Sequence, residues 1–310
     1  MNLSKIVLGT GQFGRLSEKK NAFEVMERYL ALSGRAFDTA RVYGEFGASE
    51  KIVGEFVRAH GVQKEVTIVT KGAHHSVFDE QRTPRLSEGD IKKDLHESLD
   101  ALKLDCVDIY LLHRDDPRRE VGEIVETMHG LVKSGLIKRA GVSNWKYDRI
   151  KRANEYAKEH ALTGFTFNQV EFGRAVINSD YRPDPTLVSL DADEYEKFAS
   201  DGLGVKLMAY SAQSNGFFYK AAKGGVENLP QGIKDKFLNA RTLRNLGLIT
   251  SAAEKCGATP AAVALSSVIC DKLNIAAVVG ARTVLQMEET MSALSLDCAE
   301  MRELSEKLDI

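Results

Sequence analysis

Short apolar runs alternate with amphipathic helical patterns along nearly the whole chain. Continuous apolar runs are typical of strands buried on both faces, as in a parallel sheet, whereas a helix shows an apolar stripe every three or four residues. Strands are therefore predicted at Ile6–Leu8, Ala36–Phe37, Val66–Val69, Cys106–Leu112, Ile137–Val142, Phe165–Val170, Val205–Ala209 and Ile275–Val279. Helices are predicted between and after them, over Lys19–Leu32, Ser49–His60, Glu88–Leu102, Val121–Ser134, Val284–Leu294 and Cys298–Leu308.

This alternation of strands and helices fits an α/β protein of the (β/α)8, or TIM, barrel type. The connection from Ser211 to Asn274 is a long insertion between the seventh and eighth strands. Its piece Lys220–Gly225 is interpreted as a substrate loop, and helices are expected around Thr242–Cys256 and Pro260–Lys272, the second with Thr259 as N-cap. No break in composition divides the chain, so one domain over residues 1–310 is predicted.

The composition is that of an ordinary globular protein. Apolar residues make up 43% and charged residues 28% of the chain, and the formal net charge is −2 with both signs interspersed. A nucleic-acid-binding face is therefore not expected. The first residues are too polar for a signal peptide, and no apolar run approaches the roughly 20 residues that span a bilayer. A cytoplasmic protein without a membrane partner is predicted.

Neither a metal site nor a disulfide framework is predicted. Free thiols in a reducing compartment are expected because the cysteines show no C-x-x-C spacing and no cluster with histidine: Cys106, Cys256, Cys270 and Cys298. His74 and His75 are adjacent, but neighbouring side chains diverge and no partner follows at ligand spacing. We interpret this pair as part of a solvated loop.

A glycine-rich motif after the first strand suggests a different fold. Gly9, Gly11 and Gly14 have the G-x-G-x-x-G spacing, and Asp38 follows about 20 residues later, as in the dinucleotide fingerprint of a doubly wound sheet. Here, however, the glycines do not open the next helix directly, and Lys19 gives that helix a positive first turn. An NAD-dependent dehydrogenase with a doubly wound domain is the alternative to the barrel.

Polar residues close three successive predicted strands. Asp38 ends the second strand, Lys71 the third and His113 the fourth, while Tyr43 follows shortly after Asp38. Each has a structural interpretation when taken singly, as a helix cap, a solvated lysine or a buried neutral histidine. Because the carboxyl ends of all strands converge on one face of a barrel, we expect the four side chains to meet there in an active site.

The segments around these residues resemble the aldo-keto reductase family. The matches run in order from Gly9 to about Thr290: Phe37–Gly44, Val69–Lys71 and Asp108–His113 are similar to its catalytic segments, Gly141–Asn144, Asn168–Glu171 and Ala209–Ser211 to its nicotinamide-binding segments, and Gly280–Thr283 with Gln286 and Glu289 to its adenosine-phosphate segment. The chain resembles the bacterial aryl-alcohol-dehydrogenase-like and channel β-subunit side of the family rather than the steroid-reducing branch, whose longer C-terminal substrate loop it lacks.

The resemblance implies reduction of an aldehyde or ketone to an alcohol by hydride transfer from NADPH. It makes Tyr43 the general acid that protonates the carbonyl oxygen. A neighbouring ammonium favours the phenolate form, so Lys71 would assist Tyr43, and Asp38 would hold Lys71 charged and aimed. His113 would donate a hydrogen bond to the carbonyl, an interaction that strengthens as the oxygen becomes negative.

The same resemblance implies the cofactor contacts: Gly11, Gln12, Ser143, Asn144, Gln169, Tyr210, Ser211, Gly280, Arg282, Gln286 and Glu289. Among these, Ser143, Asn144 and Gln169 would bind the carboxamide, and Tyr210 would stack on the nicotinamide. Arg282 favours NADP, because a guanidinium binds a 2′-phosphate bidentately and NAD has only a hydroxyl there. NAD is left open, because Gly280 stands where some branches of the family have lysine.

The sequence says less about the substrate and the assembly. Aromatic residues on predicted loops either line an apolar substrate pocket or pack the loops themselves: Phe13, Phe46, Trp145, Phe217, Phe218 and Tyr219. A small carbonyl compound is expected, with the protein a monomer or small homo-oligomer. Because the family also includes potassium-channel β subunits, a nicotinamide-binding sensor with little turnover is the alternative from another class.

Overall fold

Eight parallel strands close into a barrel in sequence order. The computed structural model describes residues 3–15, 18–44 and 47–310. The strands are β1 Ile6–Gly9, β2 Ala36–Asp38, β3 Thr67–Gly72, β4 Val107–Leu112, β5 Ile137–Ser143, β6 Phe167–Glu171, β7 Lys206–Tyr210 and β8 Ala276–Val279. β1 pairs with both β2 and β8, which leaves no free edge. The predicted (β/α)8 barrel is confirmed, and the doubly wound alternative is wrong.

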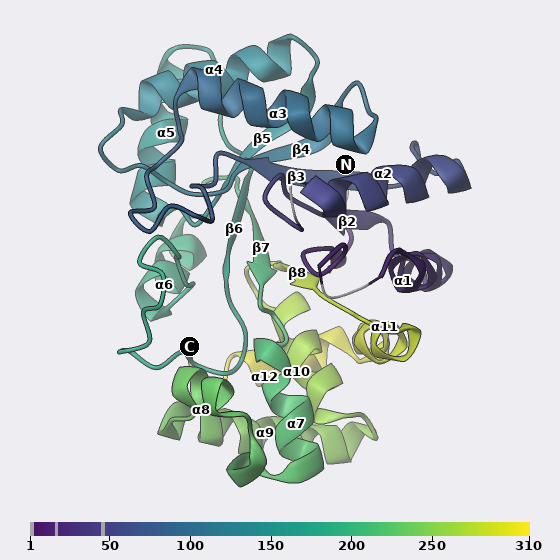
Figure 1. Ribbon diagram of the computed structural model, residues 1–310. Coiled ribbons are helices and arrows are strands. Elements are labelled where there is room, and N and C mark those ends of the chain that lie inside the picture. The colour runs from purple at the N-terminus through teal and green to yellow at the C-terminus, as the bar shows by residue number, and fades with distance from the viewer. Residues whose placement is uncertain (1–2, 16–17, 45–46) are drawn as a thin grey trace.

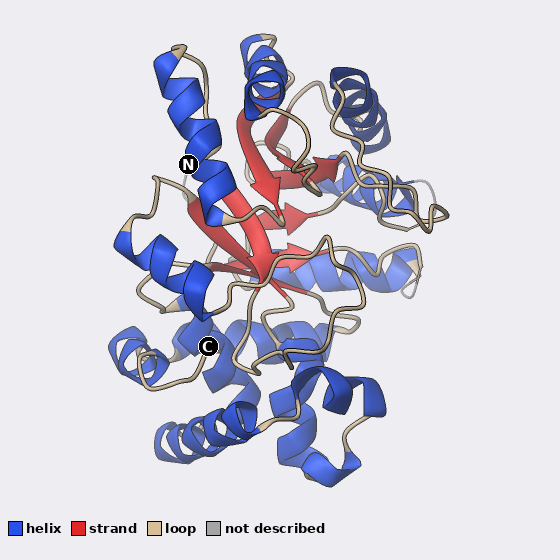
Figure 2. Cartoon of the chain, turned by 90° about the vertical axis from the view of Figure 1, so that its left-hand side faces the viewer, coloured by secondary structure: helices blue, strands red, loops and turns tan. Residues whose placement is uncertain are grey.

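Helices surround the strands on the outside of the barrel (Figures 1 and 2). One follows each of the first six strands: α1 Lys19–Ala31, α2 Ala48–His60, α3 Glu88–Leu102, α4 Val121–Lys133, α5 Tyr147–Glu159 and α6 Ala192–Ser200. The insertion after β7 contains α7 Phe217–Gly224, α8 Gln231–Phe237, α9 Ala240–Cys256 and α10 Pro260–Ile269, and β8 is followed by α11 Val284–Met291 and α12 Cys298–Ser305. In Figure 1, α7 to α10 and α12 lie together below the strands.

The apolar strands supply two separate cores. Alternate strand residues form a small cluster of their own: Val7, Ala36, Val69, Ile109, Leu111, Phe167, Met208, Ala276 and Val278. The residues between them, such as Leu8, Phe37 and Ile68, belong to the larger cluster shared with the surrounding helices. Successive side chains of a strand point to opposite faces, so the first set fills the barrel interior and the second packs outward.

Two local predictions from the sequence have different outcomes. Thr259 caps α10 as expected, because its side chain accepts a hydrogen bond from the Ala262 N–H and Pro260 occupies the first turn. The predicted substrate loop at Lys220–Gly225 is instead mostly helical and belongs to α7. Phe217, Phe218 and Ala221 recur at helical spacing and are buried, which fixes this segment as a helix until Gly225.

The glycine-rich motif serves packing rather than a helix N-terminus. Gly9 ends β1, whereas α1 begins only at Lys19. Gly14 has a positive φ of 74°, and a Cβ atom at this position would lie 2.8 Å from the Ala48 Cβ at the start of α2. Glycine is therefore required here by both backbone conformation and space.

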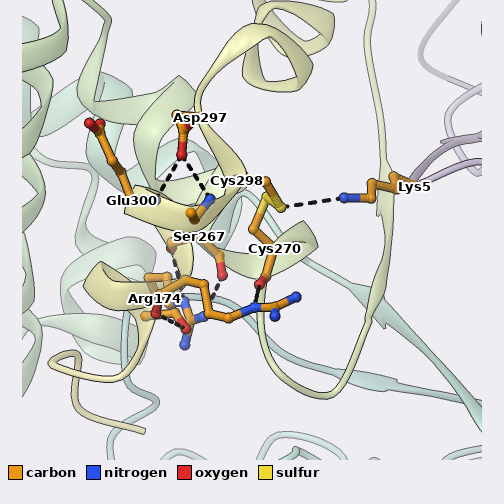
Figure 3. Close-up of a disulfide and its surroundings, with 10 residues drawn as sticks. Lys5, Arg174, Ser267, Cys270, Asp297, Cys298 and Glu300 are labelled. Carbon is orange, nitrogen blue, oxygen red and sulfur yellow. Dashed lines mark hydrogen bonds between the residues drawn. A yellow bond between two sulfur atoms is a disulfide. The ribbon is translucent and has the colours of Figure 1, made fainter.

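The expectation of four free thiols is wrong for two of the cysteines. Cys270 and Cys298 form a disulfide, with their Cα atoms 5.4 Å apart (Figure 3). Cys106 and Cys256 carry free thiols. Nothing in the cysteine spacing indicates this pair, because the packing of α10 against α12 is what brings the two cysteines together.

The described residues contain neither a membrane-spanning helix nor a cluster of metal ligands. Among residues 3–15, 18–44 and 47–310, no helix is both long and apolar enough to cross a bilayer. Over the same ranges, no three potential ligands among the histidine, cysteine and carboxylate side chains gather in a way that would hold a metal ion.

Candidate active site

The expected catalytic residues Asp38 and Lys71 occupy inward-facing positions of β2 and β3. Asp38 stands two residues past Ala36, and Lys71 two residues past Val69, where Ala36 and Val69 belong to the interior cluster. With the two-residue period of a strand, Asp38 and Lys71 also face the barrel interior, at its carboxyl end. The register of β2, β3 and β4 pairs Asp38 with Val69 and Lys71 with Leu111. The strands therefore bring these charged side chains together.

Lys71 joins the other expected catalytic groups. Its ammonium donates to the Asp38 Oδ2 at 2.7 Å, to the Thr39 carbonyl at 2.8 Å and to the Tyr43 hydroxyl at 3.4 Å. The Lys71 and Asp38 side chains are 0% and 2% exposed. Burial alone would lower the pKa of Lys71, but Asp38 and then Tyr43 outweigh it and raise that pKa. The lysine is thus held as an ammonium beside the phenol.

Tyr43 reaches this group through a tight turn after β2. The Tyr43 N–H donates to the Ala40 carbonyl, and the Tyr43 carbonyl accepts from the Ser49 N–H at the start of α2. The Ser49 hydroxyl also donates to the Thr10 carbonyl. These bonds hold Tyr43 at the start of α2, which is itself bonded to Thr10 after β1, and Tyr43 is only partly exposed.

His113 completes the group from the end of β4. Its ring lies edge-on to the Tyr43 ring, with 5.7 Å between centroids. Burial, and next the charges of Arg114 and Lys71, hold the pKa of His113 well below its usual range. The imidazole is therefore neutral and carries one N–H donor. Its buried Nδ1 has no hydrogen-bond partner among the described protein atoms.

The sequence did not indicate that His74 belongs to this group. Its ring lies edge-on to His113 at 4.7 Å, and His75 packs against it at 4.1 Å. His75 is buried and His74 half-buried, so their interpretation as a solvated loop is wrong. The available signal was position: His74 lies just past Lys71, at the end of β3 that carries the site.

The three residues expected at the carboxamide lie together, with Ser143 and Asn144 at the end of β5 and Gln169 in the middle of the neighbouring β6. Asn144, with a positive φ of 60°, donates to the Ser143 hydroxyl at 3.1 Å. The Ser143 hydroxyl donates to the Gln169 carbonyl, and the Gln169 amide donates to the Asp38 Oδ1 at 2.7 Å. Tyr210, at the end of β7, donates its O–H to the Asn144 Oδ1 at 2.8 Å. This set adjoins Asp38 and offers the amide and hydroxyl groups that a carboxamide requires.

The residues expected at the phosphates lie at the exposed ends of β1 and β8. Arg282 donates from Nε to the Gln12 Oε1 at 2.5 Å, and its N–H donates to the Gln286 Oε1. A Cβ atom on Gly11 would lie 3.6 Å from the Tyr43 ring. The segment Gly11–Gln12 therefore runs from Tyr43 to Arg282, and a dinucleotide lying along it would have its nicotinamide at Tyr43 and its phosphates at Arg282. The donor set fits such a cofactor.

Three other residues were expected to contact the cofactor: Ser211, Gly280 and Glu289. Ser211 follows β7 with a positive φ of 57°. Gly280 and Glu289 are exposed near Arg282, and a Cβ atom on Gly280 would lie 3.8 Å from the Gln12 amide nitrogen.

Most of the aromatic residues considered for a substrate pocket pack the protein instead. Four of them are 0–2% exposed and belong to the large core cluster: Phe13, Trp145, Phe217 and Phe218. Tyr219 points to solvent at 44% exposure, and Phe46 lies outside the described residues. Burial of aromatic area in the core explains their positions without a substrate.

Comparison with known proteins adds information on the family. The model of the aldo/keto reductase family matches residues 5–309. Norsolorinic acid reductase stcV of Emericella nidulans is 27% identical, over 97% of this chain and 76% of its own length. The uncharacterized oxidoreductase YrpG of Bacillus subtilis is 26% identical, over 99% of this chain and 92% of its own length.

A solved structure with a similar fold is that of the thermostable aldo-keto reductase Tm1743 in complex with the inhibitor epalrestat. It superimposes with a TM-score of 0.69, covers 98% of this chain and 95% of its own, and is 22% identical in sequence. At this identity the likeness concerns the fold.

Proposed function

We propose, from the premise that this chain belongs to the aldo/keto reductase family and is an NAD(P)H-dependent oxidoreductase, that it reduces an aldehyde or ketone with NADPH and that Tyr43 protonates the carbonyl oxygen. One observation carries the proposal. The Tyr43 hydroxyl lies 3.4 Å from an ammonium that is buried against Asp38 at the carboxyl end of the barrel. This is the arrangement that a phenolic acid needs.

The buried charges support a specific role for each residue. As Tyr43 gives up its proton, negative charge develops on the phenol oxygen, and the nearby Lys71 ammonium stabilises it. Asp38 keeps Lys71 charged and, with the Thr39 carbonyl, directs its third donor toward Tyr43. Because the ammonium is already in position, little reorganisation is needed during the reaction.

His113 orients the substrate. A neutral imidazole can donate one hydrogen bond to the carbonyl oxygen without competing with Tyr43 for proton transfer. The low pKa of His113 supports this role, since it keeps the ring neutral near pH 7. When bound, the nicotinamide supplies the hydride. Ser143, Asn144 and Gln169 would hold its carboxamide, and Tyr210 would contact its ring.

Arg282 is proposed to select NADP over NAD through the 2′-phosphate. We expect Arg282→Ala to lower the affinity for NADPH by about tenfold or more, since a charge-assisted bond to phosphate contributes roughly 1.5–3 kcal/mol, and to leave the affinity for NADH nearly unchanged. Calorimetric titration with both cofactors measures this. An equal loss for both would remove Arg282 as the selecting residue, and exposed Arg118→Ala is the control.

The sensor alternative is distinguished by turnover. A catalyst should oxidise NADPH at rates that depend strongly on which aldehyde is supplied, whereas a sensor should oxidise it slowly and indifferently. A panel of aryl and alkyl aldehydes, followed by NADPH absorbance, separates the two. The completeness of the group formed by Asp38, Tyr43, Lys71 and His113 supports the enzyme. We also propose a cytoplasmic location and a monomer or small homo-oligomer.

A further inference from the structure

Arg114 places a largely buried cation at the mouth of the barrel. It directly follows His113 after β4, and its side chain is 12% exposed. Its Nη1 donates to the His113 carbonyl at 2.9 Å, and the same carbonyl accepts from the Asn144 amide. Asn144 in turn accepts from the Tyr210 hydroxyl. The guanidinium therefore lies beside the residues proposed to hold the nicotinamide and the substrate carbonyl.

The charge of Arg114 acts on the catalytic group. After burial, Arg114 is the next cause that lowers the pKa of both His74 and His113. Burial also lowers the pKa of Arg114 itself, and Tyr210 and then Asp184 oppose that shift. Because a guanidinium stays protonated in proteins, a positive charge adjoins the place where the carbonyl compound is proposed to bind.

The acidic residues that follow Arg114 in the sequence are paired with other arginines. Asp115 lies 3.2 Å from the Arg149 Nε, and Asp116 lies 3.0 Å from the Arg118 Nε. Their carboxylates are therefore committed to other cations.

Asp184 neutralises Arg114 only in part. Its carboxylate, from the loop between β6 and α6, lies 3.6 Å from the Arg114 Nη2, which is longer than a charge-assisted hydrogen bond. The same carboxylate lies 3.6 Å from the Arg82 Nε and accepts from the N–H and the hydroxyl of Thr186. One carboxylate thus serves two guanidinium groups, so the described residues leave an excess of positive charge at this part of the mouth.

The Arg114 guanidinium is already oriented for a further partner. Its Nε donates to the Thr186 hydroxyl at 2.9 Å, and the Trp145 indole donates to the Arg114 carbonyl at 3.4 Å. Among the described residues, the bonds to Thr186 and to the His113 carbonyl are the only hydrogen bonds that this guanidinium donates. Since a guanidinium has five N–H groups, donors remain for a carboxylate, which can accept two of them at once.

We propose that the substrate carries a carboxylate in addition to its carbonyl, and that Arg114 binds this carboxylate while Tyr43 and His113 receive the carbonyl oxygen. This inference deepens the proposed function and rests on it. When substrate and nicotinamide fill the mouth, they displace water from Arg114, and a buried cation is costly unless it is paired. A carboxylate on the substrate supplies that pair, so the substrate class is a carboxy-aldehyde or an oxo acid.

The first test compares 3- and 4-carboxybenzaldehyde with the corresponding formylbenzamides, which have nearly the same shape but no charge. With NADPH, the wild type should show a kcat/KM about 10- to 100-fold higher for the acid in at least one of the two pairs, as expected for hydrogen bonds to a charged group. Arg114→Gln should abolish this preference, mainly by raising the KM of the acid. The exposed Arg118→Gln is the matched control and should keep both the preference and the activity.

Two further variants separate the charge of Arg114 from its contact with the loop. Arg114→Lys keeps the charge without the planar fork and should retain part of the preference. Thr186→Val removes the loop acceptor of Arg114 but keeps the guanidinium, so it should retain the preference for the acid. A wild type that treats acid and amide alike in both pairs would overturn the proposal, as would a preference that persists in Arg114→Gln.

Calorimetric titration distinguishes failure of the carboxylate site from failure of the proposed function. The full chain, with and without NADP⁺, is titrated with 3- and 4-(hydroxymethyl)benzoate and with their amides, which are the alcohol products of the first test. Tighter binding of an acid than of its amide, lost in Arg114→Gln, supports the site even without turnover, and in that case the proposed function alone fails. Acid binding that is no tighter than amide binding, or is undetectable, would contradict the site.

Discussion

Four polar side chains meet at the carboxyl end of the barrel: Asp38, Tyr43, Lys71 and His113. Asp38, Lys71 and His113 each follow an apolar run, and in the structure they lie together with Tyr43. A charged residue at the end of a buried strand has few structural explanations, so its position alone points to a site. Their catalytic roles stay predictions, derived from the resemblance and supported by the geometry.

Other residues could not be interpreted from the sequence alone. The His74 ring lies against His113 because of how the loop after β3 folds back. Cys270 and Cys298 meet through the packing of α10 on α12. Neither contact leaves a spacing pattern in the sequence, because each depends on tertiary packing between segments that are distant in sequence.

His74 should make stability depend on pH. Burial, and next the charge of Arg114, lower the pKa of His74 to about 4, whereas an unfolded histidine titrates near 6.5. Between these values the unfolded chain binds more protons, so stability falls as the pH decreases through this window. From about pH 7.5 to about pH 5 the expected loss from His74 is about 2 kcal/mol.

Urea unfolding at both pH values measures this dependence. His74→Asn should lose about 2 kcal/mol less on acidification than the wild type. The exposed His96→Asn should behave like the wild type. Identical pH dependence of the wild type and His74→Asn would show that His74 is not held neutral by the fold.

At the scale of elements, all eight strands were predicted, but several ends were not. β3 continues to Gly72 and β5 to Ser143, past the apolar runs that predicted them. Those extra residues include Lys71 and Ser143 of the proposed site. A strand predicted from hydrophobic periodicity therefore ends too early where the last residues of the real strand are polar and belong to the site at the barrel mouth. In the insertion, the helices predicted around Thr242–Cys256 and Pro260–Lys272 are present as α9 and α10, whereas the short helices α7 and α8 were not predicted.

The contact between α2 and α3 depends on a glycine. A Cβ atom on Gly54 would fall on the carbonyl of Leu102 at the end of α3, and a backbone group cannot move aside easily. We expect Gly54→Ala to destabilise the protein by about 2 kcal/mol, the usual cost of overpacking. Gly130→Ala in α4 is the matched control.

Gly130 is exposed, and its added methyl group meets nothing within 4 Å. This control should therefore stabilise α4 by up to about 1 kcal/mol through helix propensity. Both effects are read from urea-unfolding midpoints. A Gly54→Ala variant as stable as the wild type would mean that α2 and α3 are not in close contact at this point.

At the scale of the whole molecule, barrel closure assembles the site. Segments from Gly11 to Arg282 meet at one end only because β1 pairs with β8 as well as β2. The strand count and the alternation with helices were sufficient to predict this closure. They could not predict the arrangement of the insertion after β7, or which loops cover the mouth, because loops follow no period.

The central claim is that Tyr43 donates the proton while Lys71 supports it. The most direct test is the single-turnover rate of hydride transfer to 4-nitrobenzaldehyde, measured in preformed NADPH complexes of the wild type and Tyr43→Phe. We expect the rate to fall by about 100-fold or more, as for loss of a general acid, with the Kd for NADPH changed by less than about twofold. A Tyr43→Phe rate within about threefold of the wild type would contradict the claim.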